Sequence, residues 1–235
     1  MPKPTSWPKV VPPLSDEDQV LHDDFVRYWH EVLPRRYGLI ERFNHRYPLR
    51  SKPRDAVGSL RTLELGAGLG EHLEYEDLTD QQYTCVEIRA NQAATIEARF
   101  PGVEVIVADC QQQLPFDEAS FDRIIAVHVL EHLPDLPSAL DECHRLLRQG
   151  GVLGIVIPCD PGLAYGVARR LSAQRIFERR YGRPYGPFIR REHINSPREI
   201  VDLVRERFHI VHRRRFPWRV PPLAANLVLG FTATK

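Results

Sequence analysis

The chain has 235 residues, of which 43% are hydrophobic and 27% are charged, and its formal net charge is +1. This length and apolar fraction predict one globular domain and exclude an intrinsically disordered chain. No apolar stretch reaches the roughly 18 residues that a transmembrane helix needs, and the proline-containing N-terminus lacks the apolar segment of a secretory signal. The four cysteines form no C-x-x-C pair, which favours reduced thiols in a cytoplasmic protein.

The N-terminal part of the chain divides at Ser15. Residues 1–14 are rich in proline and are expected to be disordered. Ser15 and the acids after it predict the start of a helix, because a serine oxygen caps free backbone N–H groups and carboxylates favour the positive helix end. Apolar residues then recur at helical spacing as far as Val32. With a second short helix expected within residues 35–47, residues 15–58 are predicted to be N-terminal helices of the same domain.

A glycine-rich turn follows the first predicted strand, in the run LELGAGLG at residues 63–70. Glycine adopts positive φ freely and has no Cβ to hold a ligand away from the backbone. The dinucleotide-binding motif is G-x-G-x-x-G, whereas these glycines are spaced G-x-G-x-G. The turn therefore predicts a site for a nucleoside-like ligand and disfavours a nicotinamide or flavin coenzyme.

Further strands follow at short intervals, and two of them end in an acid. Residues 83–88 contain Glu87, residues 103–108 lead into Asp109, and residues 121–128 read as a buried fourth strand. A helix is expected from Ser138 to Leu147 and a fifth strand from Val152 to Ile157. This alternation is typical of a parallel sheet with crossover helices, and an acid after the second strand is suited to accepting ribose hydroxyls.

Positive charge is concentrated in the C-terminal part. Residues 161–219 hold fifteen Arg and no Lys against five acids, about +10, so the remainder carries about −9. A basic amphipathic helix is expected over residues 163–181 and a loop over 182–187. Its guanidinium groups suit phosphate or carboxylate, an anionic membrane surface, or a solvated helix face, and the sequence leaves these alternatives open.

The last elements are predicted from a capping box and two strand patterns. Ser196, Pro197 and Glu199 mark a helix start, and residues 208–216 and 226–234 read as two final strands. The arginine run 213–215 suits either nucleic-acid contact or, as we favour, a charged and protected sheet edge.

Together these segments resemble the class I S-adenosylmethionine-dependent methyltransferases, specifically their type 11 group. The matching pieces are LELGAGLG (63–70), VEIR (86–89), VADC (107–110), FDRIIAVHVLEHLPD (121–135) and LLRQGGVLGIVIP (146–158). The resemblance implies an α/β, Rossmann-like sheet of seven mainly parallel strands, with helices on both faces and a C-terminal antiparallel strand pair. It implies a cofactor-binding core at 59–160, a substrate lid in the insertion 161–195, and a final helix and strands at 196–235. The N-terminal helices would either cover the cofactor or substrate or pack against the sheet edge.

The resemblance also implies that the cofactor is S-adenosyl-L-methionine. The glycines of the turn would lie under its methionine portion, Glu87 would accept the ribose hydroxyls, and Asp109 the adenine amino group. The backbone N–H of Cys110 would reach the adenine ring, and the backbone at His128 the cofactor amino group. The predicted cofactor-binding residues are Glu64, which would orient the turn, Gly66, Gly68, Gly70, Glu87, Asp109, Cys110 and His128.

Methyl transfer to a hydroxyl benefits from a base whose pKa lies near the working pH. His132 follows the fourth strand and is the first candidate, and His193 in the insertion is the second, with Tyr165 and Asp160 behind them. The spelling H-x-x-E-H at 128–132 resembles a zinc peptidase motif, but Pro134 stops the helix that such a motif needs. Some related O-methyltransferases hold a divalent ion with E-x-x-E-H here. Because His128 takes the first place, we predict no metal.

The sequence therefore predicts a methyltransferase for a small or amphipathic acceptor. The favoured reaction is O-methylation of an anionic sugar or of a polysaccharide- or lipid-linked precursor, with membrane-surface contact through residues 163–191 as an additional prediction. The alternatives are a ubiquinone-type or secondary-metabolite O-methyltransferase, an RNA methyltransferase and a non-catalytic cofactor-binding regulator. Nucleic acid is not favoured, because the motifs of RNA methyltransferases are missing. The sequence does not determine the oligomeric state.

Overall fold

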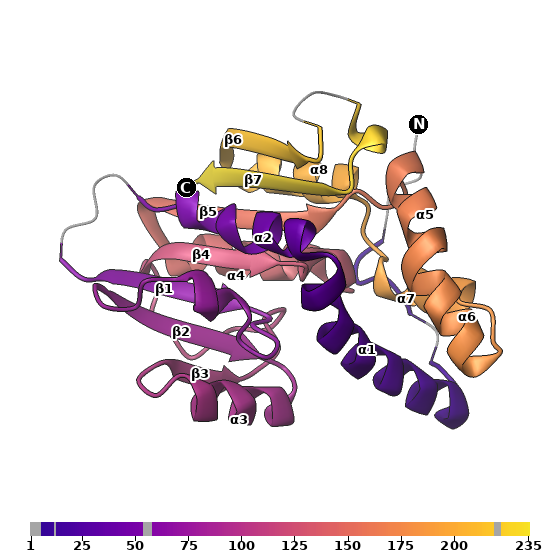
Figure 1. The fold of residues 1–235 in the computed structure, drawn as a ribbon. Coiled ribbons are helices and arrows are strands. Elements are labelled where there is room, and N and C mark those ends of the chain that lie inside the picture. The colour runs from indigo at the N-terminus through magenta and orange to yellow at the C-terminus, as the bar shows by residue number, and fades with distance from the viewer. Residues whose placement is uncertain (1–5, 12, 54–57, 219–221) are drawn as a thin grey trace.

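A computed structural model describes residues 6–11, 13–53, 58–218 and 222–235. Its centre is a seven-stranded sheet of order β3-β2-β1-β4-β5-β7-β6 (Figure 1). Strands β1 to β5 run parallel, and β7 is antiparallel to both β5 and β6. The predicted sheet with its C-terminal antiparallel pair is thus confirmed. The strands are β1 (Leu60–Leu65), β2 (Gln81–Glu87), β3 (Glu104–Val107), β4 (Phe121–Val127), β5 (Leu147–Pro158), β6 (His209–Phe216) and β7 (Val228–Thr234).

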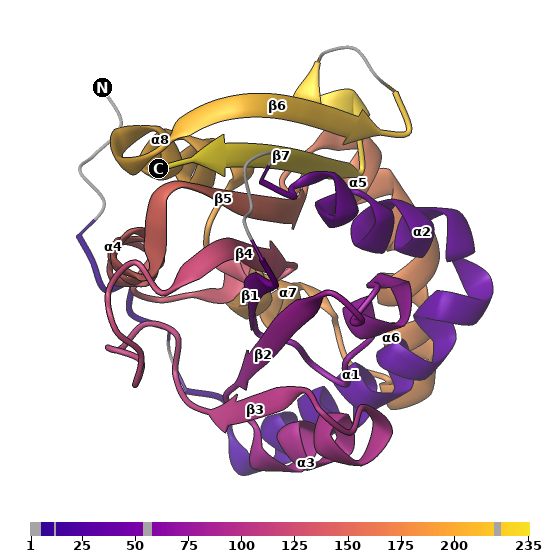
Figure 2. The same cartoon turned by 90° about the vertical axis from the view of Figure 1, so that its left-hand side faces the viewer.

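Helices cover both faces of the sheet because its inner strands are apolar on both sides. On β4, Ile124 and Ala126 join the core under α4 (Leu136–Leu146) and α8 (Pro197–Arg207), whereas Ile125 faces the core under α3 (Ala90–Arg99). Helix α2 (Gly38–Arg46) covers the same side as α3, over β5 and β7 (Figure 2). Successive side chains of β4 thus point into the two cores in turn, which is the period-two pattern expected of a parallel sheet covered on both faces.

A group of helices lies beyond the carboxyl ends of the parallel strands, at the right of Figure 1. Helix α1 (Asp16–Arg36) crosses this end. Helices α5 (Leu163–Arg169) and α6 (Arg175–Tyr181) are joined by a π-helical turn (Arg170–Gln174) and are followed by α7 (Gly186–Glu192). Helices α1, α6 and α7 and the π-helical turn share a hydrophobic core of their own, in which Phe25 of α1 meets Phe177 of α6 edge-on with 5.0 Å between ring centroids. We call α1 and α5–α7 the lid.

Several local expectations are met and others need correction. Ser15 accepts a hydrogen bond from the backbone of Asp18, and Ser196 and Glu199 form the predicted capping box. The arginine run 213–215 lies on β6, the edge strand, as favoured. All four cysteines are free and buried. Helix α7 begins at Gly186, inside the predicted 182–187 loop, because its apolar residues complete the lid core.

One further expectation was wrong in extent. Strand β5 starts at Leu147, five residues before the expected Val152, because the chain leaves α4 directly into pairing with Phe121 across an irregular register. The disorder expected of residues 1–14 stays a prediction. Within the described part of this segment, Lys9 donates to the Ile194 carbonyl and pairs with Glu199 at 2.9 Å. No helix within the described residues is long and apolar enough to cross a membrane.

Candidate active site

A cavity of about 950 Å³ is lined by residues at the carboxyl ends of the parallel strands and by residues of the lid. The cavity lies where β1 and β4 are neighbours in the sheet. The connection after β1 leads toward β2 and the connection after β4 leads toward β5, so the two connections leave in opposite directions. This switch point is where open α/β sheets bind ligands, because the diverging loops leave a crevice. Of the two sequence alternatives for the N-terminal helix, covering the site is the one observed, because His22, Phe25, Val26 and Trp29 of α1 line the cavity.

The glycine turn after β1 forms one wall of this cavity. Gly66 and Gly68 have φ values of 62° and 60°, a left-handed conformation that other residues adopt at a cost. A Cβ on Gly66 would lie 2.6 Å from the side chain of Val129, so this position also lacks space. The turn therefore needs glycine for its backbone shape and for close packing against the loop after β4.

Glu87 holds this turn in place. It is 3% exposed at the end of β2, and its two carboxylate oxygens accept hydrogen bonds from the backbone N–H groups of Gly68 (3.0 Å) and Arg89 (2.9 Å). Each oxygen has a second lone pair available for a ligand. The side chain proposed to bind ribose hydroxyls thus also fixes the glycine turn.

The other predicted residues of the cofactor end also line the cavity. Asp109 accepts hydrogen bonds from the backbone and side-chain amides of Gln111, and Cys110 is buried beside it. Glu64 accepts a hydrogen bond from the Tyr83 hydroxyl at 2.8 Å, and burial raises the pKa of Glu64 to about 8. Its described contact is therefore with β2, and its role in orienting the glycine turn stays a prediction.

At the other end, histidines and acids surround the buried Glu131. The Glu131 side chain is 1% exposed, and its Oε1 atom lies 3.1 Å from His128 Nδ1 and 3.8 Å from His132 Nε2. His128 has a φ of 54°, and its backbone N–H donates to the Val156 carbonyl. Burial favours neutral histidine and lowers the pKa of His132. For His128, burial acts in the same sense, but the hydrogen bond with Glu131 and the negative charges of Glu131 and Glu41 together outweigh it and raise the pKa.

The lid contributes a second acid to this cluster. Glu192 of α7 lies 2.6 Å from His22 of α1 and 3.3 Å from His132 Nδ1. Burial favours the neutral acid, but the hydrogen bond with His22 and the charges of His132 and His22 lower the pKa of Glu192 to about 2. That same hydrogen bond raises the pKa of His22. The acid thus connects both lid segments to the predicted base.

His193 approaches His132 from the lid, with 5.4 Å between their ring centroids. Its Nδ1 lies 2.9 Å from Asp160, which also accepts hydrogen bonds from Arg169. Tyr165 packs beside the His193 ring. The four predicted acceptor-end residues are therefore brought together by the fold.

Ligand-type atoms of Glu131, His132 and His193 all lie within 4.8 Å of one another, a spacing that suits a divalent cation. The E-x-x-E-H arrangement weighed from the sequence would use His128 in place of His193, and His128 is not part of this group. The prediction that no metal binds stays a prediction.

Comparisons with known proteins agree with this geometry. Residues 63–155 match the family model described as "Methyltransferase domain". A probable S-adenosylmethionine-dependent methyltransferase of Mycobacterium tuberculosis is 33% identical over 96 residues, which are 41% of this chain and 35% of that protein. The demethylmenaquinone methyltransferase of Chlamydia caviae is 31% identical over 102 residues, 42% of this chain and 44% of that protein. The chain thus spans less than half the length of these curated relatives.

The fold comparison covers nearly the whole chain. The 1,6-didemethyltoxoflavin-N1-methyltransferase of Burkholderia thailandensis, solved with bound S-adenosylhomocysteine, has a TM-score of 0.59 over 97% of this chain and 93% of that one, at 23% identity. The chain contains a class I S-adenosylmethionine-dependent methyltransferase domain. The predicted family, fold and cofactor are thereby confirmed.

The cavity of the methyltransferase domain fits this cofactor. The glycine turn offers bare backbone to a ligand that carries its own charges, and Glu87 and Asp109 offer acceptor oxygens on the same wall. The roles of individual residues remain proposals.

Sequence reasoning missed Glu131 as the buried centre of the cluster, and Glu192 as the contact between His22 and His132. Each acid stands directly before a predicted histidine, in Glu131-His132 and Glu192-His193, and that repeated pairing was the available signal.

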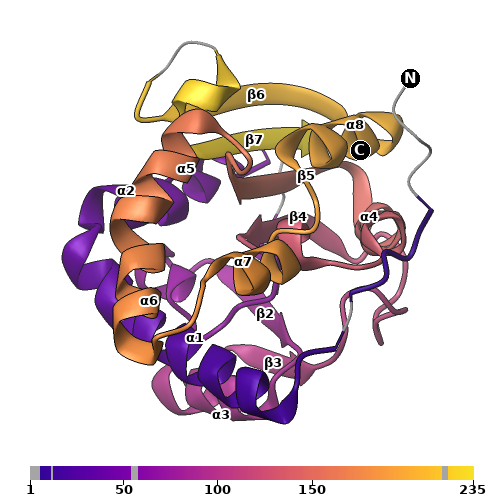
Figure 3. The same ribbon diagram turned by 90° about the vertical axis from the view of Figure 1, so that its right-hand side faces the viewer.

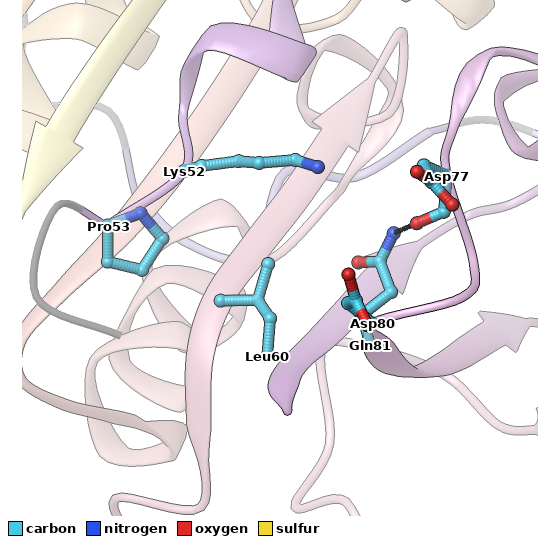
Figure 4. Close-up of a pocket in the computed structure, with 6 residues that line it drawn as sticks. All are labelled: Lys52, Pro53, Leu60, Asp77, Asp80 and Gln81. Carbon is cyan, nitrogen blue, oxygen red and sulfur yellow. Dashed lines mark hydrogen bonds between the residues drawn. The ribbon is translucent and has the colours of Figure 1, made fainter. Parts of the chain in front are cut away.

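A second, shallow cavity of about 210 Å³ lies at the opposite end of the sheet, beside Leu60 at the start of β1 (Figure 4). There Gln81 donates to the Asp77 carbonyl, and Lys52 and Pro53 form the facing wall. Because parallel sheets bind ligands at their carboxyl ends, this amino-end cavity is not the active site of the methyltransferase domain.

Proposed function

We propose that the protein is a methyltransferase that transfers the methyl group of S-adenosylmethionine to a small or amphipathic acceptor. The observation that carries this proposal is the single cavity shared by the glycine turn with Glu87 and Asp109 at one end, and by His132 and His193 at the other. Binding both reactants in one enclosed space converts the transfer into an intramolecular step.

The cofactor, when bound, supplies a methyl group on a positively charged sulfur. The protein positions the acceptor and removes its proton. We propose that His132 accepts this proton: its lowered pKa keeps the imidazole neutral near pH 7, and Glu192 lies at Nδ1 to stabilise the cation that forms. His193, oriented by Asp160, would hold the acceptor hydroxyl beside it. Helices of the lid line the same cavity above them.

The lining of the cavity supports an acceptor that is both apolar and anionic. Trp29, Phe25 and Tyr165 give it aromatic surface. Arg169 is neutralised by Asp160, but Arg191 also lines the cavity and has no carboxylate partner among the described residues. A guanidinium group binds phosphate or carboxylate with two parallel hydrogen bonds. We therefore propose O-methylation of an anionic sugar or of a polysaccharide- or lipid-linked precursor in the cytoplasm.

A quinone-pathway acceptor is the second candidate. It is favoured by the similarity to the demethylmenaquinone methyltransferase and to a 2-methyl-6-phytyl-1,4-hydroquinone methyltransferase of rice, 29% identical over 111 residues, and by the same aromatic walls.

Incubation with methyl-labelled S-adenosylmethionine and fractionated cell extract tests the proposal. Labelling of an anionic glycan or lipid-linked fraction would support it, and labelling of a neutral quinone fraction would support the second candidate. Labelled RNA would contradict both. If the protein binds S-adenosylhomocysteine in calorimetry but labels no fraction, a non-catalytic regulator becomes the better explanation.

A further inference from the structure

The lid helix from Leu163 to Tyr181 has an inner and an outer side. Its inner side supplies Tyr165, Ala168 and Ser172 to the cavity wall, and Phe177 to the lid core. Backbone angles remain helical across the π-helical turn, so α5 and α6 form one continuous rod (Figure 3). A single rod therefore separates the active-site cavity from the outside of the molecule.

The outer side carries an apolar stripe. Leu163, Val167 and Leu171 follow one another at intervals of four residues, and are 78%, 46% and 70% exposed. Leu171 lies at the rim between the two sides, because it also lines the cavity. Residues at this spacing lie on one face of a helix. Scattered exposed apolar residues are ordinary on protein surfaces, but an aligned set on one helix marks an interaction surface.

The arginines of this helix form two groups, one paired with carboxylates of the protein and one exposed and unpaired among the described residues. Arg180 pairs with Asp24 of α1, and Arg169 pairs with Asp160. Arg170, Arg175 and Arg179 are exposed, and within the described residues no carboxylate pairs with them. A π-helical turn bonds each residue to the fifth one after it, so Arg175 follows Arg170 by one turn. Unpaired positive charge thus continues the apolar stripe along the rod.

We propose that this outer face, formed by Leu163, Val167, Arg170, Leu171, Arg175 and Arg179, docks the protein on an anionic lipid bilayer. A helix with exposed leucines beside unpaired arginines lies in the plane of a membrane, where its apolar side chains enter the lipid and its charges meet anionic headgroups. This docking would deepen the proposed function, because an amphipathic acceptor in the bilayer would be separated from the cavity only by the width of this helix. That part of the inference rests on the proposed function. The docking itself does not depend on methyl transfer.

Sedimentation of the full chain with vesicles tests the proposal. We expect the protein to bind mixed phosphatidylcholine–phosphatidylglycerol vesicles and not pure phosphatidylcholine vesicles. Leu163→Glu, which does not line the cavity, should weaken binding at least about tenfold, because one leucine no longer enters the lipid. Arg175→Gln should weaken it about fivefold, the contribution of one basic residue near an anionic surface. Added salt should weaken the remaining attraction.

Val211→Glu is the matched control. Val211 is 61% exposed on β6 and follows Ile210, which pairs with Ala233 near the C-terminus. The C-terminus lies at the opposite end of the sheet from α5 (Figure 1). This variant should bind vesicles like the wild type. Equal binding of Leu163→Glu and the wild type, or equal binding to neutral and anionic vesicles, would overturn the proposal. Calorimetry with S-adenosylhomocysteine on the same samples separates the two claims: vesicle binding without cofactor binding keeps the docking surface and removes the methyltransferase.

Discussion

Replacement of Glu87 by glutamine is the sharpest test of the cofactor end. Glutamine has nearly the same shape, but it carries one acceptor oxygen where glutamate carries two. In the wild type these oxygens each accept a backbone N–H, from Gly68 at 3.0 Å and from Arg89 at 2.9 Å. In Glu87→Gln one of these N–H groups must face an NH₂ group. The substitution thus loosens the glycine turn and removes the charge proposed to accept the ribose hydroxyls.

The expected loss follows from hydrogen bonds to a charged, buried acceptor. Such bonds contribute about 1.5–3 kcal/mol each, compared with about 1 kcal/mol for neutral pairs. Each of the two ribose hydrogen bonds that changes from charged to neutral therefore loses about 0.5–2 kcal/mol, which is about 1–4 kcal/mol for both. Since about 1.4 kcal/mol corresponds to a tenfold change, the Kd for S-adenosylhomocysteine should rise at least about fivefold and up to several hundredfold.

Isothermal titration calorimetry measures this change directly, with thermal unfolding of the free protein as a check on folding. Glu97→Gln is the matched control, because Glu97 is an exposed acid on α3. The control should bind like the wild type. A folded Glu87→Gln variant with wild-type affinity would refute the assignment of this carboxylate to the ribose.

Three further predictions concern the acceptor end, the lid and the stability of the fold. His132→Ala should slow turnover at least about a hundredfold, the usual contribution of a general base, with unchanged affinity for S-adenosylhomocysteine in calorimetry; full activity would remove His132 as the base. The pKa of His22 is raised, so its ion pair with Glu192 stabilises the lid fully below pH 6.5 and is lost as the pH rises through the pKa of His22. The pKa of Glu192 is lowered, so this acid stays charged to pH values well below 4.5. Amide hydrogen exchange in α1, corrected for its intrinsic pH dependence, should therefore be better protected in slightly acidic than in slightly alkaline buffer, and His22→Gln should abolish that difference; the same difference in the variant would exclude this pair as its cause. Ser196→Ala removes the capping box of α8 and should lower the free energy of unfolding by about 1 kcal/mol in urea titrations, and an unchanged midpoint would show that the cap contributes nothing measurable.

The sequence by itself determined the sheet, its switch point and the cofactor end of the site. These features depend on local patterns: a glycine turn at residues 66–70, acids after two neighbouring strands, and apolar strands alternating with helices. Because parallel strands end at one edge of a sheet, residues that are separate in the chain, such as Glu87 and Asp109, are brought to the same wall by topology alone. Capping residues such as Ser15 and Ser196 were equally readable, since their hydrogen bonds reach only three residues along the chain.

Only the tertiary structure decided how the lid is built and which groups meet at the acceptor end. His22 and Glu192 are separated by 170 positions and yet lie 2.6 Å apart, and Phe25 packs against Phe177 across a similar distance in sequence. No periodicity specifies such a pairing, because each helix only requires some apolar partner and the fold selects which one. The same holds for His132 and His193. Their adjacency depends on α7 folding back over the end of β4, a contact between distant segments that packing energy stabilises and local propensity does not encode.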